Sequence, residues 1–288
     1  MNHKYYIPER FEKEIVLHAL RVYNKNFLHA PIMLAIDGPT GEGKTYQCSL
    51  VLERIGCKVF PLSAGQFESK DAGAPAQLVR STYNSAVDYM KESPENLAAM
   101  LIDDADVAFG NWGDLVQYTV NTQGVIGELM NIANSPLSMD SIRVPIYLTG
   151  NDLKRIYAPL RRTGRMDFFF WQPTISEKAL MLFYLLDYLD LEKCEELVSY
   201  VERKCNENNL IPASVSFYSM MISHMYDNKL WNSYLYIKQN SFDKIPLYKS
   251  ISIINSEIGI EELKALADNT INQIILSNND YTGQMKGS

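Results

Sequence analysis

Eight residues near the start of the chain have the types and the spacing of a phosphate-binding loop, the Walker A motif. Gly38, four variable residues, Gly43, Lys44 and Thr45 follow an apolar run directly. Glycines let the backbone turn its N–H groups toward an anion, and a helix that begins at the lysine adds its positive end. The lysine would reach the β- and γ-phosphates of a nucleoside triphosphate, and the threonine hydroxyl would ligate Mg²⁺. The expected phosphate-contacting residues are Gly38, Pro39, Thr40, Gly41, Glu42, Gly43, Lys44, Thr45 and Tyr46.

A pair of carboxylates ends a second apolar run. Residues 98–102 lead into Asp103 and Asp104, as in a Walker B motif, where one carboxylate partners Mg²⁺ and the next activates water. We therefore assign Asp103, with Thr45, to the metal and Asp104 to catalysis. Many such ATPases carry glutamate at the second position, so the shorter Asp104 predicts slow turnover. The alternative interpretation is a solvated acidic strand end.

A polar amide and an arginine cluster complete the candidate catalytic side chains. Asn151 follows the apolar run 144–149 and would orient the attacking water or sense the γ-phosphate. Arg161, Arg162 and Arg165 come shortly after it. An arginine supplied to the nucleotide of a neighbouring subunit can stabilise charge in the transition state. Otherwise such a cluster is ordinary solvated or salt-bridged surface.

These side chains need a sheet whose edge brings them together. Residues 31–172 alternate short apolar runs with amphipathic stretches, which is typical of a parallel sheet with helices on both faces. Helical spacing of apolar residues appears within 79–90 and within 126–133. The expected strands are 31–37, 59–63, 98–103, 144–149 and 167–171.

The pattern changes after Pro173, where strand-like runs nearly vanish and helical stripes take over. One such stripe, from Val215 to Met225, would begin at Ser214 as its N-cap. We predict an α/β nucleotide-binding domain over 1–173, a small helical lid domain over 174–240, and a C-terminal helical extension over 241–288 with a frayed end.

Composition narrows the class of protein. The 288 residues include 27 Lys and Arg against 34 Asp and Glu, a net charge of −7, and 47% of them are hydrophobic. This excludes overall disorder and disfavours nucleic acid as a partner, because nucleic-acid affinity usually comes from a basic face. No apolar run reaches the length of a membrane span, and the start does not resemble a secretory signal. Four cysteines without paired spacing favour reduced thiols and a cytoplasmic location.

The order of loop, double aspartate, sensor asparagine and late arginines, followed by a helical domain, resembles an AAA+ ATPase. Within that class the chain is similar to Rubisco activase from about Ile7 to Thr174, and weakly on to Tyr226. The segments that carry the similarity are YQC (46–48), SAG (63–65), ES (68–69), AGAPA (72–76), QYTVN (117–121), LMNIA (129–133), TGND (149–152), YAPL (157–160) and TGRM (163–166).

The resemblance implies a homo-oligomeric ring, expected to be hexameric, in which subunits hydrolyse ATP with Mg²⁺ and pore loops pull on a client protein like a chaperone. Its pore loops would correspond to 65–73 and 110–113, which makes Phe67 and Trp112 candidate client-contacting aromatics. Arg162 and Arg165 fall on arginines of the family. The alternative for each aromatic is ordinary packing.

Two departures from the family shape the functional hypotheses. By comparison with the family, we expect no counterpart ahead of Ile7 of the N-terminal extension with which activases engage Rubisco, so the client need not be Rubisco. Ile222 and His224 stand where the family carries candidate second-sensor arginines. The leading hypothesis is an ATP-driven remodelling machine. The second is a nucleotide-gated assembly or scaffold protein with little turnover, and a DNA-linked ATPase is disfavoured by the charge.

Overall fold

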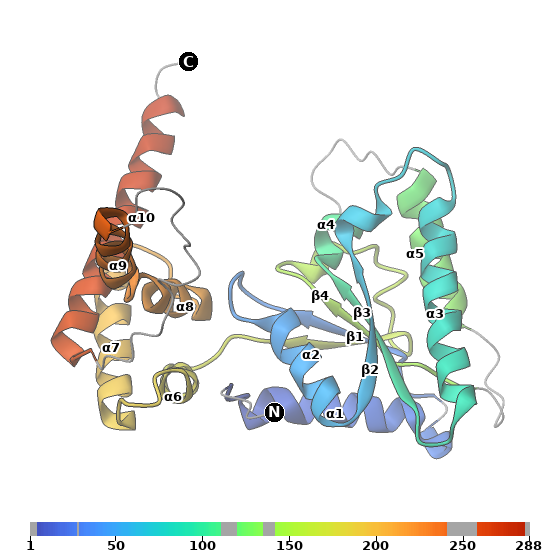
Figure 1. The fold of residues 1–288 in the computed structure, drawn as a ribbon. Coiled ribbons are helices and arrows are strands. Elements are labelled where there is room, and N and C mark those ends of the chain that lie inside the picture. The colour runs from blue at the N-terminus through green and yellow to red at the C-terminus, as the bar shows by residue number, and fades with distance from the viewer. Residues whose placement is uncertain (1–4, 28, 111–119, 135–141, 241–257, 286–288) are drawn as a thin grey trace. The chain divides into compact units, whose positions relative to one another are not determined.

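The computed structural model describes residues 5–27, 29–110, 120–134, 142–240 and 258–285. The chain divides into two compact units. Residues 7–172 form the first, called here the sheet unit, and residues 1–6 with 173–288 form the second, called the helical unit. Figure 1 shows both. Among the described helices, none has the length and apolar character that crossing a bilayer requires.

A five-stranded parallel sheet is the centre of the sheet unit, which confirms the predicted fold class. The strands lie in the order β2-β3-β4-β1-β5, and every neighbouring pair is parallel. Their bounds differ from the prediction by at most two residues at either end. They are β1 (Met33–Asp37), β2 (Cys57–Ser63), β3 (Leu97–Asp103), β4 (Ile146–Thr149) and β5 (Met166–Phe170).

The sheet register places the polar ends of three strands side by side. Ser63 pairs with Asp103, and Ile36 pairs with Thr149. Asp103 and Thr149 therefore reach the same edge at which β1 leads into the loop 38–43. Ligands of open parallel sheets bind at this carboxyl edge.

Helices cover both faces of the sheet (Figure 1). Helix α1 (Glu9–Tyr23) packs with α2 (Lys44–Arg54), and α3 (Ala74–Glu92) packs with α5 (Val120–Ala133). Buried residues of α3 and α5 share one core with residues of the sheet and of α4 (Ala105–Phe109). Three short 3₁₀ turns complete the described elements of the sheet unit: η1 (Lys25–Phe27), η2 (Ala64–Phe67) and η3 (Leu153–Arg155).

Helix α1 is a difference from the sequence-based prediction, which has no element there. It begins after Pro8, a residue compatible with helix starts, and carries acidic Glu9 and Glu12 in its first turn. Its buried stripe, at helical spacing, is Phe11, Ile15, His18, Ala19 and Val22. The stripe includes a polar histidine, which obscures the apolar period.

The helical unit is built from α6 (Ile175–Leu185), α7 (Leu191–Glu207), α8 (Val215–His224), α9 (Asp227–Asn240) and α10 (Ile260–Met285). Helix α7 packs against α6 and α10. Leu263, Ala267 and Ile271 of α10 belong to the same core as Leu197 and Val201 of α7. Helix α10 lies in the segment expected to be a separate extension, and it contributes to the core of the helical unit.

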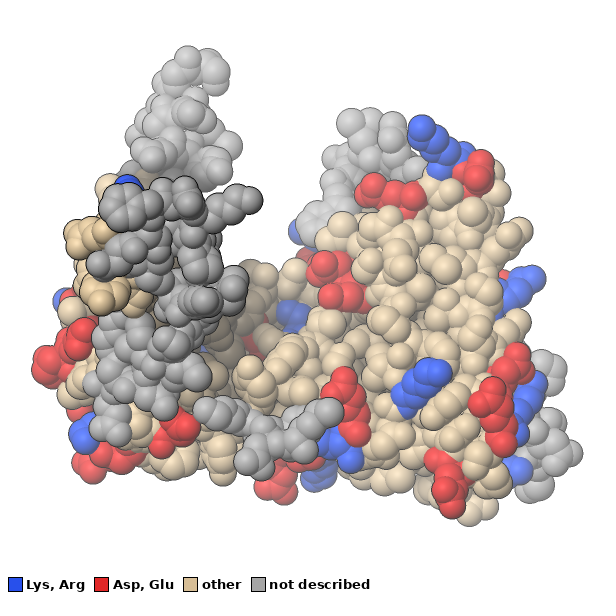
Figure 2. Space-filling model, in the orientation of Figure 1, with Lys and Arg blue, Asp and Glu red and all other residues tan. Residues whose placement is uncertain are grey.

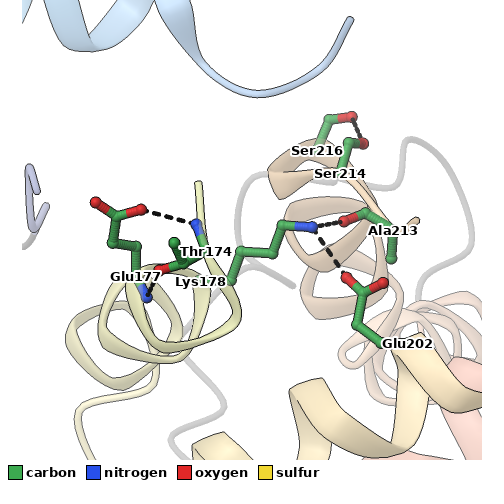
Figure 3. A network of polar contacts seen from close by, with 7 residues as sticks. All are labelled: Thr174, Glu177, Lys178, Glu202, Ala213, Ser214 and Ser216. Atoms are coloured by element: carbon green, nitrogen blue, oxygen red, sulfur yellow. Dashed lines mark hydrogen bonds and ion pairs between the residues drawn. The ribbon is translucent and has the colours of Figure 1, made fainter. Parts of the chain in front are cut away.

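A buried lysine ties three parts of this unit together (Figure 3). Lys178 of α6 is 4% exposed, and its Nζ donates to Glu202 Oε1 of α7 at 2.9 Å and to the carbonyl of Ala213 at 2.5 Å. Thr174 caps α6 with a reciprocal bond to Glu177. Ser214 occupies the N-cap position of α8 as expected, but its hydroxyl pairs with that of Ser216 instead of a backbone N–H.

Candidate phosphate-binding site

A cavity of about 280 Å³ opens at the carboxyl edge of β1, β3 and β4. Its walls come from the glycine-rich loop, the first turn of α2 and the ends of β3 and β4. The lining residues are Thr40, Gly41, Gly43, Lys44, Thr45, Tyr46, Asp103, Asp104, Thr149, Gly150 and Asn151. The fold thus gathers side chains that are more than 100 positions apart in the sequence around one space.

The loop can take its course because its first residue is glycine. Gly38 has φ +150°, and a Cβ placed on it would lie 1.9 Å from the backbone oxygen of Trp171. Any side chain there would push the loop away from the end of β5.

Lys44 lies under the loop with its ammonium group held by three oxygens. Nζ donates to the carbonyls of Gly38 and Pro39, each at 2.7 Å, and to Asn151 Oδ1 at 3.0 Å. Lys44 is only 7% exposed, and burial lowers its pKa, although the carboxylate of Asp106 acts in the opposite direction. A buried cation beside a cavity lined by backbone amides suits an anionic ligand.

Three oxygens from three elements converge beside this lysine. Thr45 Oγ1 donates to Asp103 Oδ1 at 2.6 Å, and Thr149 Oγ1 donates to the same atom at 2.7 Å. The two hydroxyls lie 2.9 Å apart. Thr149 was not among the predicted site residues. A threonine at the end of an apolar run before Gly150 and Asn151 was its only signal.

The donor set fits a hard cation that shares its coordination with a phosphate ligand. A carboxylate and hydroxyl oxygens are the ligand types that Mg²⁺ takes, usually with phosphate and water completing the shell. Within the described part of the chain, no group of three or more His, Cys, Asp or Glu side chains is placed to hold a metal by itself. The residues therefore fit Mg²⁺ brought with a nucleotide rather than a resident protein cage.

Asp104 stands at the mouth of the cavity and is exposed. Its backbone adopts a left-handed conformation with φ 53° at the N-cap position of α4. Partial burial and the nearby carboxylates of Asp103 and Asp106 raise its pKa.

Asp106 is a buried residue that sequence reasoning missed. Its Oδ2 accepts the backbone N–H groups of Asn151 and Asp152, each at 3.0 Å. These bonds fix the segment that carries Asn151 beside Lys44. Its position three residues after Asp103, in an amphipathic turn, gave no separate signal.

The arginines lie away from this cavity and differ from one another. Arg165 is tied down, because Nη1 donates to the carbonyl of Pro159 at 2.6 Å and Nε to Asn134 Oδ1 at 3.0 Å. Arg161 Nε donates to the carbonyl of Ile156 at 2.7 Å. Arg162 is exposed.

Of the two aromatics considered for client contact, Phe67 and Trp112, the structure describes only Phe67. Phe67 is 7% exposed and packs against Phe109 with ring centroids 5.3 Å apart, so here it is a core residue, which was the alternative interpretation. A larger cavity of about 600 Å³ adjoins it, lined in part by Glu68, Lys70 and Val107. Trp112 lies outside the described residues.

The surface carries both charge signs. On the face drawn in Figure 2, the described acidic and basic side chains are interspersed, and neither sign forms an extended patch.

Known proteins resemble this chain in sequence and in fold. The family of ATPases associated with various cellular activities (AAA) matches residues 34–174. The chain is 35% identical to the Rubisco activases of Anabaena sp. and of Nostoc sp., in alignments that cover 98% of this chain and 66% and 67% of those relatives. It is 34% identical to the chloroplastic activase 1 of Nicotiana tabacum, with 85% of this chain and 58% of the relative covered. The chain thus spans about two thirds or less of the length of these relatives.

A solved structure extends the likeness to the fold. The HORMA, CdnC and Trip13 complex of E. coli MS115-1 contains a chain that aligns with a TM-score of 0.58 over 88% of this chain and 89% of its own length. The sequences are 18% identical, so this likeness concerns the fold alone.

Proposed function

Because the chain belongs to the AAA ATPases and, within them, to the proteins similar to Rubisco activase, we propose that it hydrolyses ATP with Mg²⁺ to remodel a protein client. The observation that carries this proposal is the meeting of Lys44, the Thr45–Asp103–Thr149 oxygens and Asn151 around one cavity. Such a combination of cation, metal ligands and polar amide suits phosphoryl transfer.

Each residue has a task that follows from its place. Lys44 would exchange its bonds to the loop carbonyls for phosphate oxygens, and Asn151, already 3.0 Å from Nζ, would hold the attacking water. Asp104 would accept the proton of that water. Thr45 and Asp103 would hold Mg²⁺, which supplies charge neutralisation to the phosphates.

The proposal includes a homo-oligomer, a hexameric ring by analogy with the family, in which Arg162 reaches the nucleotide of a neighbouring subunit. Arg162 is exposed, whereas Arg165 is bonded to its own subunit. The client is a protein and need not be Rubisco, and the pore loops, with Trp112, would contact it. We keep the cytoplasm as the expected compartment, which the four buried thiols support.

Phosphate release from ATP tests the activity. We expect Mg²⁺-dependent hydrolysis whose specific rate rises with protein concentration as oligomers form. Lys44→Ala should lower it by about a hundredfold or more, because the phosphate charge loses its buried partner. Lys91→Ala is the matched control, since Lys91 is exposed in α3 and pairs only with Asp88 among the contacts described. Equal rates for the two variants would contradict the proposal.

A nucleotide-gated scaffold is the second candidate. The short, exposed side chain of Asp104 favours it, as do Ile222 and His224 at the positions of possible sensor arginines. Negligible phosphate release together with ATP-dependent assembly in analytical ultracentrifugation would support the scaffold over the motor.

A further inference from the structure

Trp171 contacts the phosphate-binding loop at two points. It follows β5 directly, and its backbone N–H donates to the carbonyl of Asp37 at 2.7 Å, while its backbone oxygen lies against Gly38. Its indole Nε1 donates to the carbonyl of Glu42 at 2.9 Å. Trp171 is 0% exposed, so this bond is shielded from water. Trp171 therefore bonds to the residue before the loop and to the fifth position of the loop, and it lies against the first position.

The Glu42 carbonyl is held by two donors. Besides the indole, Gln47 Nε2 of α2 donates to the same oxygen at 3.1 Å. Across a planar trans peptide, the C=O of one residue and the N–H of the next point in opposite directions. Turning the Glu42 oxygen into the protein therefore turns the Gly43 N–H outward, and Gly43 lines the cavity with φ 73°.

The indole itself is fixed on several sides. The guanidinium of Arg10 lies 4.6 Å from its ring centroid, and Arg10 Nη2 donates to the carbonyl of Gln172 at 3.0 Å. The rings of Phe11 and Phe169 pack against it at centroid distances of 4.8 and 6.0 Å. A donor locked by its neighbours holds its acceptor in one orientation, which is what preorganised binding requires.

We propose that Trp171 is a positioning residue for phosphate binding, because its indole N–H sets the peptide between Glu42 and Gly43 so that the Gly43 N–H faces the phosphate. Trp171 does not touch the ligand; it acts through the peptide. The inference rests on the proposed function, since it assumes that the loop binds the phosphates of a nucleotide.

The variant Trp171→Phe keeps an aromatic ring and removes the donor. We expect the full-length variant to bind ADP about three- to tenfold more weakly than wild type in isothermal titration calorimetry, the worth of one buried hydrogen bond. Trp231→Phe is the matched control, because Trp231 lies in α9 of the helical unit and is 59% exposed. It should bind ADP like wild type.

A spectroscopic measurement separates positioning from loss of packing. Glu42-Gly43 is the only Glu-Gly pair in the chain, so carbonyl-¹³C glutamate with ¹⁵N glycine isolates the Gly43 amide. In nuclear magnetic resonance spectra, ADP should move the Gly43 amide signal downfield in the wild-type protein. In Trp171→Phe it should move the same signal by a visibly smaller amount. Gln47→Met removes the second donor to the same oxygen from another element and should reduce the shift as well.

The outcomes are distinct. Unchanged ADP affinity and an unchanged Gly43 shift in Trp171→Phe would overturn the inference. If that variant does not fold, Gln47→Met decides, and an unchanged shift there overturns it too. Wild-type protein that binds neither ADP nor ATP would overturn the proposed function and this inference together. If wild type binds and the Trp171→Phe and Gln47→Met variants show the same ADP affinity and the same Gly43 shift as wild type, the inference alone is overturned.

Discussion

His18 is a histidine that the fold keeps neutral. It lies buried between α1 and the sheet, with Nε2 3.2 Å from the carbonyl of Pro31 and its ring edge-on to Tyr147 at 5.1 Å. Burial lowers its pKa to about 3, and the positive charges of Arg21 and Arg143 act in the same direction. His18 therefore binds a proton near pH 6.5 in the unfolded chain and only near pH 3 in the folded chain.

This difference predicts acid sensitivity. Between the two pKa values the unfolded state binds more protons, so the free energy of unfolding should fall as pH drops, by up to about 1.4 kcal/mol per pH unit from this residue. His18→Gln should remove that part of the slope in urea unfolding measured at several pH values. His29→Gln, at an exposed position, is the control. An identical slope in His18→Gln would show that another group governs the acid limb.

Single residues of the site differ in whether a local sequence motif identifies them. Lys44, Thr45 and Asp103 can be predicted from the sequence, because their spacing and the strand before them already define the chemistry. Thr149 and Trp171 could not be predicted, because each works through a contact with a residue more than 40 positions away. Such contacts depend on strand order and register, which no local pattern contains.

At the scale of elements, the Lys178–Glu202 pair joins α6 to α7 in a nearly dry setting. Lys178→Met should lower the free energy of unfolding of the helical unit by about 3 kcal/mol, because it leaves Glu202 and the Ala213 carbonyl without their cation. Lys193→Met should cost well under about 1 kcal/mol, since its partner Asp190 is exposed. Urea unfolding monitored by circular dichroism measures both.

The double variant Lys178→Met with Glu202→Leu provides the counter-test. Removing both charges should restore most of the lost stability, because neither partner is left buried alone. If the double variant is no more stable than Lys178→Met, packing of the lysine stem rather than the charge pair holds the helices.

Strands and helices differed in how well they could be predicted. Each strand is a short apolar run bounded by polar or turn residues, and buried parallel strands show this pattern plainly. Helix α1 was not predicted, because His18 interrupts its apolar stripe. The core shared by α7 and α10 could not be anticipated either, because two amphipathic stripes do not reveal which partner each one covers.

At the scale of the whole molecule, Arg162 tests whether catalysis needs a neighbour. Arg162→Ala should retain ATP binding and lose hydrolysis by about a thousandfold, the usual worth of an arginine supplied in trans. Mixing it with Lys44→Ala subunits should restore part of the activity, because the intact sites of the first variant would meet the arginines of the second.

Arg165→Ala is the comparison for this mixing experiment. Arg165 is bonded to Pro159 and Asn134 of its own subunit, so its loss should lower the melting temperature and should not be complemented by Lys44→Ala subunits. Normal hydrolysis by Arg162→Ala alone, or no recovery on mixing, would contradict the assignment.

The helical unit is discontinuous in sequence, since it takes in residues 1–6 as well as 173–288. Tyr6 stacks on Tyr184 of α6 with ring centroids 5.2 Å apart. The chain therefore passes between the units twice, at 6/7 and at 172/173. A protease that cuts only after Gln172 would leave residues 1–6 covalently attached to the sheet unit. The ring of Tyr6 would still stack on Tyr184 of the helical unit. Separating the two units by proteolysis therefore needs two cuts, one at each crossing.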